Sequence, residues 1–417
     1  MGWAALSGTV PFYSLYALLF THAGLTGTQI SALFAIWSVV GVLAQVPAGV
    51  VADRYSRRGA LVAGALLEAG GYGLWLGLPS FPGFAAGFAL WGISVALISG
   101  TVEALLYDGL AGSGADGHFA TVFGRVEAAG LLATIPGALA GGALLRIGGY
   151  PLVGWVSVAC CLAVAALAYR LPEPPRGGAT EPPCGGVTEP GCGGVTEPGC
   201  DADERSRRLP DAGEAPDHAG RGSYLAMLRT GLAEILTRAP LRAAVLLAAA
   251  LGGVDAIDEY FPLMAAGWGV PAALVPVAVL GIPLAGAAGS AAGPVLAGAG
   301  RGAMAAVLVV AGLALGAAAL VHRPVALAAV AVFYALYRLV LVLVDTRLQE
   351  RIASGARATV TSVAGLGTDA ASVGLFAAWA AGGLPVIAAL VLAIGVALPR
   401  ALRRSPVPAA RVGATPR

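Results

Sequence analysis

The chain has 417 residues, of which 58% are hydrophobic and only 12% are charged, and its formal net charge is +2. Soluble domains carry about 25% charged residues, so this composition and a mean hydropathy of +0.81 exclude an ordinary soluble protein. We therefore expect a multi-pass membrane protein.

Long apolar runs follow one another along the chain, and a run of about 20 apolar residues spans the hydrocarbon core of a bilayer. Only helices or a closed barrel satisfy the backbone in lipid, and runs this long exclude barrel strands of about ten alternating residues. We predict an all-α membrane protein with twelve transmembrane helices in two six-helix bundles. The predicted helices cover residues 3–22, 29–51, 59–79, 84–108, 121–146, 151–170, 241–267, 271–297, 302–321, 324–349, 357–381 and 384–400.

The basic residues, all of them arginines, predict the orientation. Of the 25, 22 lie on one side of the predicted helices, whereas the other side has only Arg146 and Arg323. Because cytoplasmic loops are enriched in basic residues, we expect both termini and the central loop inside the cell. The absence of lysine suggests a GC-rich bacterial genome, so the expected location is the cytoplasmic membrane of a bacterium. We expect no cleavable signal peptide.

The composition divides the chain into three parts. Residues 1–171 form the predicted N-terminal bundle, and residues 172–222 form a Pro- and Gly-rich cytoplasmic linker too polar to make a core. Residues 223–417 contain a predicted amphipathic interfacial helix over 223–239, the C-terminal bundle and a short tail. Three Thr-Glu-Pro repeats in the linker end in Cys184, Cys192 and Cys200; we interpret them as an expanded repeat rather than a metal or redox tether.

The turn between predicted helices two and three has the sequence Gly-Val-Val-Ala-Asp-Arg-Tyr-Ser-Arg-Arg-Gly over residues 49–59. It resembles the G-x-x-x-D-R-x-x-R-R signature that the major facilitator superfamily carries at this place. The resemblance covers both bundles but not the linker or the tail. It implies a secondary transporter whose two bundles rock about a central cavity, with the substrate site between the halves.

In that family this loop is thought to latch the cytoplasmic side while the cavity faces outward. Gly49 would permit close helix packing, and the arginines would reach carboxylates on neighbouring helix ends. Plain anchoring by positive charge is the alternative, and it explains the arginines but not Asp53 beside Gly49. The predicted latch consists of Gly49, Asp53, Arg54, Arg57, Arg58 and Asp108.

Predicted helix five is rich in glycine and resembles the Gly/Pro motif of helix five in the family's proton-coupled exporters. Pro-Gly replaces the usual Gly-Pro, and one extra residue precedes the glycine pair. Because small residues also serve close packing of membrane helices, the segment is compatible with packing alone, with a slight preference for export. The residues concerned are Gly130, Pro136, Gly137, Gly141 and Gly142.

Predicted helix seven contains three acids at positions i, i+3 and i+4, followed by a tyrosine. Carboxylates in an apolar helix are unfavourable unless they line water, bind cations or hold protons, so they are candidates for proton coupling. A wetted outer vestibule is the alternative, since the acids lie past the middle of the helix. The candidates for proton coupling or substrate binding are Asp255, Asp258, Glu259, Tyr260, Glu103 and Glu127.

One arginine, Arg338, lies inside predicted helix ten. An unpaired arginine at this depth is unfavourable, so we expect an intramembrane ion pair with Asp345 or Asp369. Many proton-linked members of the family have an arginine four residues before a glycine in helix four. Ala96 stands at that place before Gly100, so proton coupling has to use other residues, and the helix-seven acids are the preferred ones.

These features predict proton-coupled efflux, by antiport, of a small amphiphilic molecule or drug. A proton-coupled importer (symporter) of a small nutrient shares the fold and the acids and is the first alternative. A facilitator-fold receptor or scaffold that no longer transports is less favoured, because it has no need of intramembrane acids. With no nucleophile–base or metal arrangement in the sequence, we expect no enzyme activity, metal or cofactor. The expected partners are the substrate, protons and the lipid bilayer, with no nucleic acid, for a monomeric protein.

Overall fold

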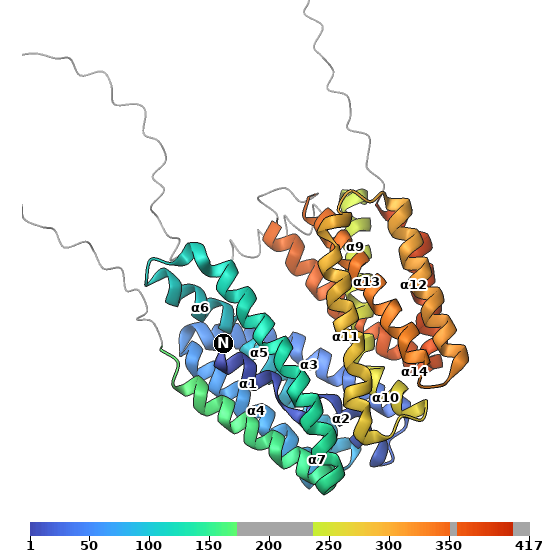
Figure 1. Cartoon of the computed structure of the whole chain (residues 1–417). Coiled ribbons are helices and arrows are strands. Elements are labelled where there is room, and N and C mark those ends of the chain that lie inside the picture. Colours follow the sequence, from blue (N-terminus) through green and yellow to red (C-terminus); the bar gives the residue numbers. More distant parts are fainter. Residues whose placement is uncertain (173–236, 351–356, 403–417) are drawn as a thin grey trace, which may run out of the picture. The chain divides into compact units, whose positions relative to one another are not determined.

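The computed structural model describes residues 1–172, 237–350 and 357–402, and every element within these ranges is helical (Figure 1). The linker predicted over 172–222, nearly all of the interfacial helix predicted over 223–239, and the C-terminal tail lie outside the described residues.

The N-terminal half consists of seven α-helical segments and 3-10 turns in chain order. These are α1 (Gly2–Gly8), the 3-10 turn η1 (Pro11–Ser14), α2 (Tyr16–His22), α3 (Gly27–Arg54), α4 (Arg57–Gly77), α5 (Phe81–Ile98), α6 (Thr101–Ala111), η2 (Asp116–His118) and α7 (Phe119–Tyr169).

The C-terminal half continues with α-helices and three 3-10 turns. These are α9 (Ala239–Val254), η3 (Asp255–Tyr260), α10 (Phe261–Gly267), η4 (Ala272–Leu274), α11 (Val275–Ala292), η5 (Pro294–Leu296), α12 (Arg301–Val321), α13 (Ala326–Gln349) and α14 (Arg357–Ala401).

Ten segments of the described chain are long and apolar enough to cross a membrane, and two of them are long enough to cross it twice. Helices α7 and α14 have 51 and 45 residues. At about 1.5 Å per residue each would be roughly twice as long as the hydrocarbon core is thick. Gly149 (φ 65°) and Gly383 (φ 64°) interrupt them with a left-handed residue. Each therefore provides two spans, and the twelve-helix prediction is confirmed for the described residues.

Within each half, neighbouring helices pack in similar pairs. In the N-terminal half, α3 and α4 contact α5, and α1 and α4 contact α7; in the C-terminal half, α9 and α12 contact α14, and α11 and α12 contact α13. The halves meet through α3 with α14, α7 with α11, and α2 with α10. The second and eleventh spans and the fifth and eighth spans thus form matching contacts between the halves.

Three predicted spans are not continuous helices. The first is broken at η1, the fourth at Ser99 and Gly100, and the seventh at η3. Pro11 and Pro262 explain two of the breaks, because proline lacks the N–H for the helical bond and its ring clashes with the carbonyl four residues back. Gly100 (φ 73°) adopts the left-handed conformation that ends α5 and starts α6.

Two residues form the turn between α3 and α4. The Ser56 side chain caps α4 by accepting a hydrogen bond from the Gly59 N–H at 2.7 Å. This tight turn places Asp53 in the last turn of α3 and Arg57 in the first turn of α4.

Replacing Gly149 tests the break in α7. A Cβ there would meet only the Pro151 ring at 3.6 Å, so the left-handed backbone alone opposes a side chain. We expect Gly149→Ala to lower stability by about 1 kcal/mol, measured as a lower denaturation midpoint in detergent. Gly73→Ala in α4, where a Cβ meets no atom within 4 Å, is the matched control and should not lower the midpoint. Equal midpoints for both variants would contradict the break.

Candidate functional site

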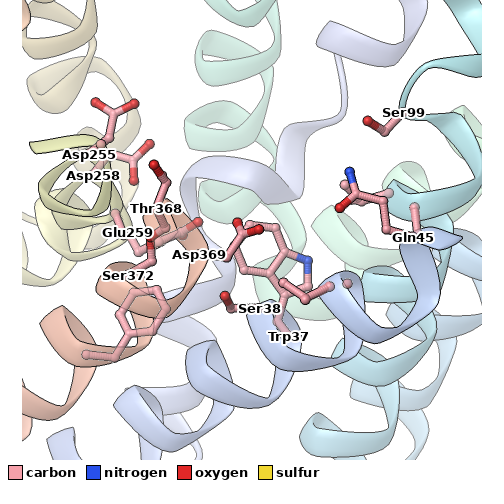
Figure 2. Close-up of a pocket in the computed structure, with 17 residues that line it drawn as sticks. Trp37, Ser38, Gln45, Ser99, Asp255, Asp258, Glu259, Thr368, Asp369 and Ser372 are labelled. Atoms are coloured by element: carbon pink, nitrogen blue, oxygen red, sulfur yellow. The ribbon is translucent and has the colours of Figure 1, made fainter. Parts of the chain in front are cut away.

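A central cavity of about 360 Å³ lies between the two halves (Figure 2). Helix α3 contributes Trp37, Ser38 and Gln45, and Ser99 comes from the break after α5. The C-terminal half contributes residues of η3 and α14 that are mostly acidic or hydroxylic: Asp255, Asp258, Glu259, Thr368, Asp369 and Ser372. The cavity is therefore acidic on one wall and neutral, polar and aromatic on the other.

The 3-10 turn η3 brings the three acids together. In a 3-10 helix the side chains at i and i+3 are eclipsed, so Asp255 and Asp258 project in the same direction. A continuous α-helix was expected here, and Pro262 is the reason for the tighter turn. All three acids line the central cavity, and Tyr260, the next residue, is buried.

Asp255 forms an ion pair with Arg338 of α13. The Arg338 Nη1 donates to Asp255 Oδ2 at 2.7 Å, and the Tyr334 hydroxyl donates to Oδ1 at 2.9 Å. The Arg338 Nε also lies 3.4 Å from Ser290 Oγ. This network fixes the position of Asp255 and links the start of η3 to α13.

The predicted partners of Arg338 are not the ones that the structure provides. Asp345 is seven residues along the same helix, which corresponds to about 10 Å of rise, and it is exposed. Asp369 lies on α14 and lines the central cavity. Asp255 is the partner of Arg338 instead, because η3 lies beside α13. The sequence does not reveal this proximity.

The other cavity acids lack such a partner. Among the described residues, Asp258, Glu259 and Asp369 have no basic group within 4 Å. The same part of the chain contains no group of three or more His, Cys, Asp or Glu side chains arranged to hold a metal ion. A cavity with unpaired carboxylates favours cations or protons over anions.

A mostly aromatic cluster adjoins the cavity at Phe376, and we call it the end cluster: Ser31, Phe34, Tyr260, Phe376 and Trp379. The Tyr260 hydroxyl and Ser31 Oγ are 2.7 Å apart and hydrogen-bonded, and the ring centroids of Tyr260 and Trp379 are 3.9 Å apart. Phe34 contacts both Tyr260 and Phe376. Ser31 is near the start of α3, so the end cluster lies away from the arginine-rich turn after Arg54.

That turn forms a charge cluster. Arg57 contacts Asp53 at 3.3 Å and also forms an ion pair with Asp108 of α6. The Arg58 guanidinium lies 5.3 Å from the Tyr169 ring centroid, and Arg54 is exposed. A Cβ at Gly49 would meet no atom within 4 Å, so the close packing expected at this glycine is not present in this structure.

The glycine-rich part of α7 allows close approach. A Cβ at Gly141 would lie 2.9 Å from the Pro11 carbonyl oxygen, and one at Gly142 would clash with the Ala273 carbonyl oxygen. Gly137 faces Gly8 and Thr9, and Gly130 faces the Ala4 carbonyl at the longer distance of 3.6 Å. These contacts, next to Pro136, fit the packing interpretation of the motif, and Gly142 extends it to the C-terminal half.

Two of the candidate acids lie elsewhere. Glu103 on α6 and Glu127 on α7 are exposed and do not line the central cavity. A different acid, Glu68 on α4, is almost fully buried and was not among the candidates. The signal that could have identified it is Tyr72, four residues later on the same helical face.

Comparison with known proteins points to one family. A family model described as Major Facilitator Superfamily matches residues 1–377. A mutant of the nucleoside transporter NupG superposes with a TM-score of 0.71 at 11% identity, covering 96% of this chain and 98% of that one. The D-xylose-proton symporter gives 0.64 at 14% identity, with 95% of each chain covered.

A bacterial homolog of the human lysosomal transporter Spinster, in an inward-facing and occupied conformation, gives a TM-score of 0.64 at 15% identity. It covers 96% of this chain and 89% of that one. No curated protein sequence matches the chain. At these identities the solved structures show a common fold.

A double-mutant cycle tests the Asp255–Arg338 pair. Arg338→Gln and Asp255→Asn should each lower the denaturation midpoint in detergent, because each leaves the other charge uncompensated. The double variant should lose less stability than the two single variants together, with a coupling energy of about 1 kcal/mol for a partly exposed pair. In the control cycle of Arg338→Gln with Asp345→Asn, the two losses of stability should add. A coupling energy between Arg338 and Asp345, together with none between Arg338 and Asp255, would show that Asp345 is the partner, as the sequence predicted.

The end cluster gives a second prediction. Tyr260→Phe removes a hydrogen bond between the halves that is worth about 1 kcal/mol. The fraction of molecules whose cavity is open at the end cluster should therefore rise about fivefold. Ser38→Cys in an otherwise cysteine-free chain should then react about fivefold faster with an impermeant maleimide added on that side. Tyr16→Phe, a buried tyrosine within the N-terminal half, is the matched control. An unchanged rate in Tyr260→Phe would show that the end cluster does not close the cavity.

Proposed function

This chain belongs to the Major Facilitator Superfamily, and we propose that it exports a small amphiphilic molecule in exchange for protons. Membership makes it a secondary transporter of a small molecule rather than an enzyme. The observation that carries the proposal is the central cavity, where Asp258, Glu259 and Asp369 face an aromatic and polar wall with no basic group of the described residues within 4 Å.

The acids of η3 suit proton coupling because their environment changes when the halves move. They line the central cavity, next to the buried end cluster. We propose that the end cluster separates the cavity from the outer side of the membrane in this state. In the proposed cycle, Asp258 or Glu259 takes a proton from outside while the cavity is open there. After the end cluster closes, the proton leaves to the cytoplasm and the carboxylate becomes available to the substrate. Ionisable side chains inside membrane spans commonly mark such pathways.

The wall opposite the acids supports an amphiphilic substrate. Trp37 provides an apolar surface, while Ser38, Gln45 and Ser99 provide hydroxyl and amide groups. Pockets for small molecules combine apolar walls with a few polar groups in this way.

The arginine distribution supports the proposed orientation. We propose that the turn carrying Arg57, the central linker and both termini face the cytoplasm of a bacterial cell, with the end cluster on the outer side. The Arg57 contacts with Asp53 and Asp108 support a role of this turn in stabilising one end of the N-terminal half, as expected for a latch.

Proton-coupled import of a small nutrient is the second candidate. It uses the same cavity acids, and one protein of the same fold is a D-xylose-proton symporter. Export and import differ only in the direction of substrate flux relative to the protons.

Proton flux in inside-out vesicles tests the proposal. Energised vesicles receive a panel of amphiphilic compounds, ethidium among them, and a pH-sensitive dye reports proton release. We expect compound-dependent dye recovery, lost in the double variant Asp258→Asn/Glu259→Gln and retained in Glu127→Gln, whose carboxylate lies outside the cavity.

Two outcomes would change the proposal. Unchanged recovery in the double variant would exclude these acids as the coupling groups. No recovery with any compound would reject export for that panel and favour import, which uptake of labelled nutrients into intact cells would then detect.

A further inference from the structure

The N-terminal half contains a second cavity, of about 250 Å³, around a single buried carboxylate. Its wall includes Trp3 of α1, Tyr13 of η1, Glu68 of α4, and Trp91 and Ser94 of α5. Val95 and Ser99 line both this side pocket and the central cavity, so the two cavities adjoin.

Glu68 is held at a fixed position by two tyrosines. The Tyr72 hydroxyl donates to Oε1 at 2.9 Å, and the Tyr13 hydroxyl donates to the same oxygen at 3.1 Å. Within the described residues, Oε2 accepts no hydrogen bond and no basic group lies within 4 Å of the carboxylate. Only 8% of Glu68 is exposed. A buried anion without a counter-ion is strongly unfavourable, so this position favours a positively charged group.

The surroundings of Glu68 suit an organic cation. Tyr13 and Trp91 both line the pocket, and their rings contact each other at a tilt, with centroids 5.4 Å apart. Aromatic rings of this kind beside a carboxylate attract an organic cation. Tyr13 is 41% exposed although its hydroxyl reaches the buried Glu68, so its ring borders the open space. An inorganic ion would need several oxygen ligands, whereas one carboxylate between aromatic rings fits an ammonium group on an apolar body.

Two further polar atoms beside the pocket point to a ligand. In the part of the chain that the structure describes, Ser94 Oγ is fully buried without a hydrogen-bond partner, and so is the Trp3 Nε1. Buried polar groups are nearly always hydrogen-bonded, and unpaired ones need an explanation. An ammonium group that donates to Ser94 Oγ would supply the missing partner of that hydroxyl.

We propose that the side pocket binds the ammonium group of an amphiphilic amine, with Glu68 as its counter-ion and Tyr13 and Trp91 as its aromatic walls. The apolar body of the same molecule extends past Val95 and Ser99 into the central cavity. The identification of this amine as the transported molecule rests on the proposed function. Its binding in the side pocket does not depend on the proposed function.

Equilibrium binding to the purified full chain in lipid nanodiscs tests this inference. The probes are phenyltrimethylammonium and its uncharged carbon isostere tert-butylbenzene, which have the same shape and differ in charge. Quenching of tryptophan emission reports binding, since Trp3 and Trp91 line the pocket. We expect the parent protein to bind the cation at least tenfold more tightly than the isostere.

Glu68→Gln keeps the size and the acceptor oxygen of the side chain and removes its charge. The cation should then bind about tenfold more weakly, while the isostere changes by less than twofold. Glu127→Gln removes an exposed carboxylate outside both cavities and should change neither. If Glu68→Gln does not fold, the double variant Asp258→Asn/Glu259→Gln still tests the proposal, because a cation bound in the side pocket requires the preference to persist in that variant.

Three results would overturn the proposal. The first is equal affinity of the parent for both probes. The second is an unchanged preference for the cation in Glu68→Gln. The third is a preference that is lost only in Asp258→Asn/Glu259→Gln, which would assign the cation to the central cavity. Because binding needs no proton gradient, this experiment fails independently of the flux experiment. Intact cation preference without dye recovery would reject proton-coupled export alone, and intact dye recovery without cation preference would reject the side pocket alone.

Discussion

The requirement that backbone groups be hydrogen-bonded in hydrocarbon governs this structure. A lipid-facing helix cannot be interrupted, because the freed N–H and C=O groups would find no partner there. The first, fourth and seventh spans are nevertheless broken, at η1, at Ser99 and Gly100, and at η3. Each break contributes to a cavity wall: Tyr13 and Ser99 line the side pocket, and the acids of η3 line the central cavity. Irregular backbone therefore occurs where protein or a polar cavity surrounds it, and those places coincide with the candidate site.

The packing of the spans follows from the same environment. Lipid tails offer no hydrophobic driving force between helices, so close contact and small residues hold the halves together. The glycines of α7 show this at Gly141 and Gly142, where the carbonyls of Pro11 and Ala273 occupy the space of a side chain. The contact at Gly142 joins the two halves near η4, while α3 and α14 join them on the other side. The contact between α3 and α14 borders the central cavity, which residues of both helices line.

Much of the fold could be predicted from the sequence because length and hydropathy determine a membrane span. The breaks at Gly149 and Gly383 fell between predicted helices, since a glycine in a short polar or Pro-containing interval ends an apolar run. The acids of η3 were recognisable because three carboxylates in one apolar run are unfavourable without a role. The partner of Arg338 was predicted wrongly, since periodicity describes one helix and the Asp255 contact joins two. The surroundings of Glu68 could not be predicted for the same reason, as its second tyrosine, Tyr13, lies 55 residues away on a broken segment.

The arrangement of η3 connects charge to movement. Glu259 lines the cavity, and Tyr260, the next residue, belongs to the end cluster with Ser31 and Trp379. A 3-10 turn of six residues is too short for these two to move independently, so opening the end cluster must displace the carboxylate. The ion pair between Asp255 and Arg338 anchors the start of η3. The end of η3 that carries Glu259 and Tyr260 is therefore the part that can rearrange. A proton or a cation on the carboxylates can shift the equilibrium only by binding the open and closed states differently. In the proposed cycle the adjacency of Glu259 and Tyr260 provides that difference, because the state of the end cluster decides which side of the membrane the carboxylates face.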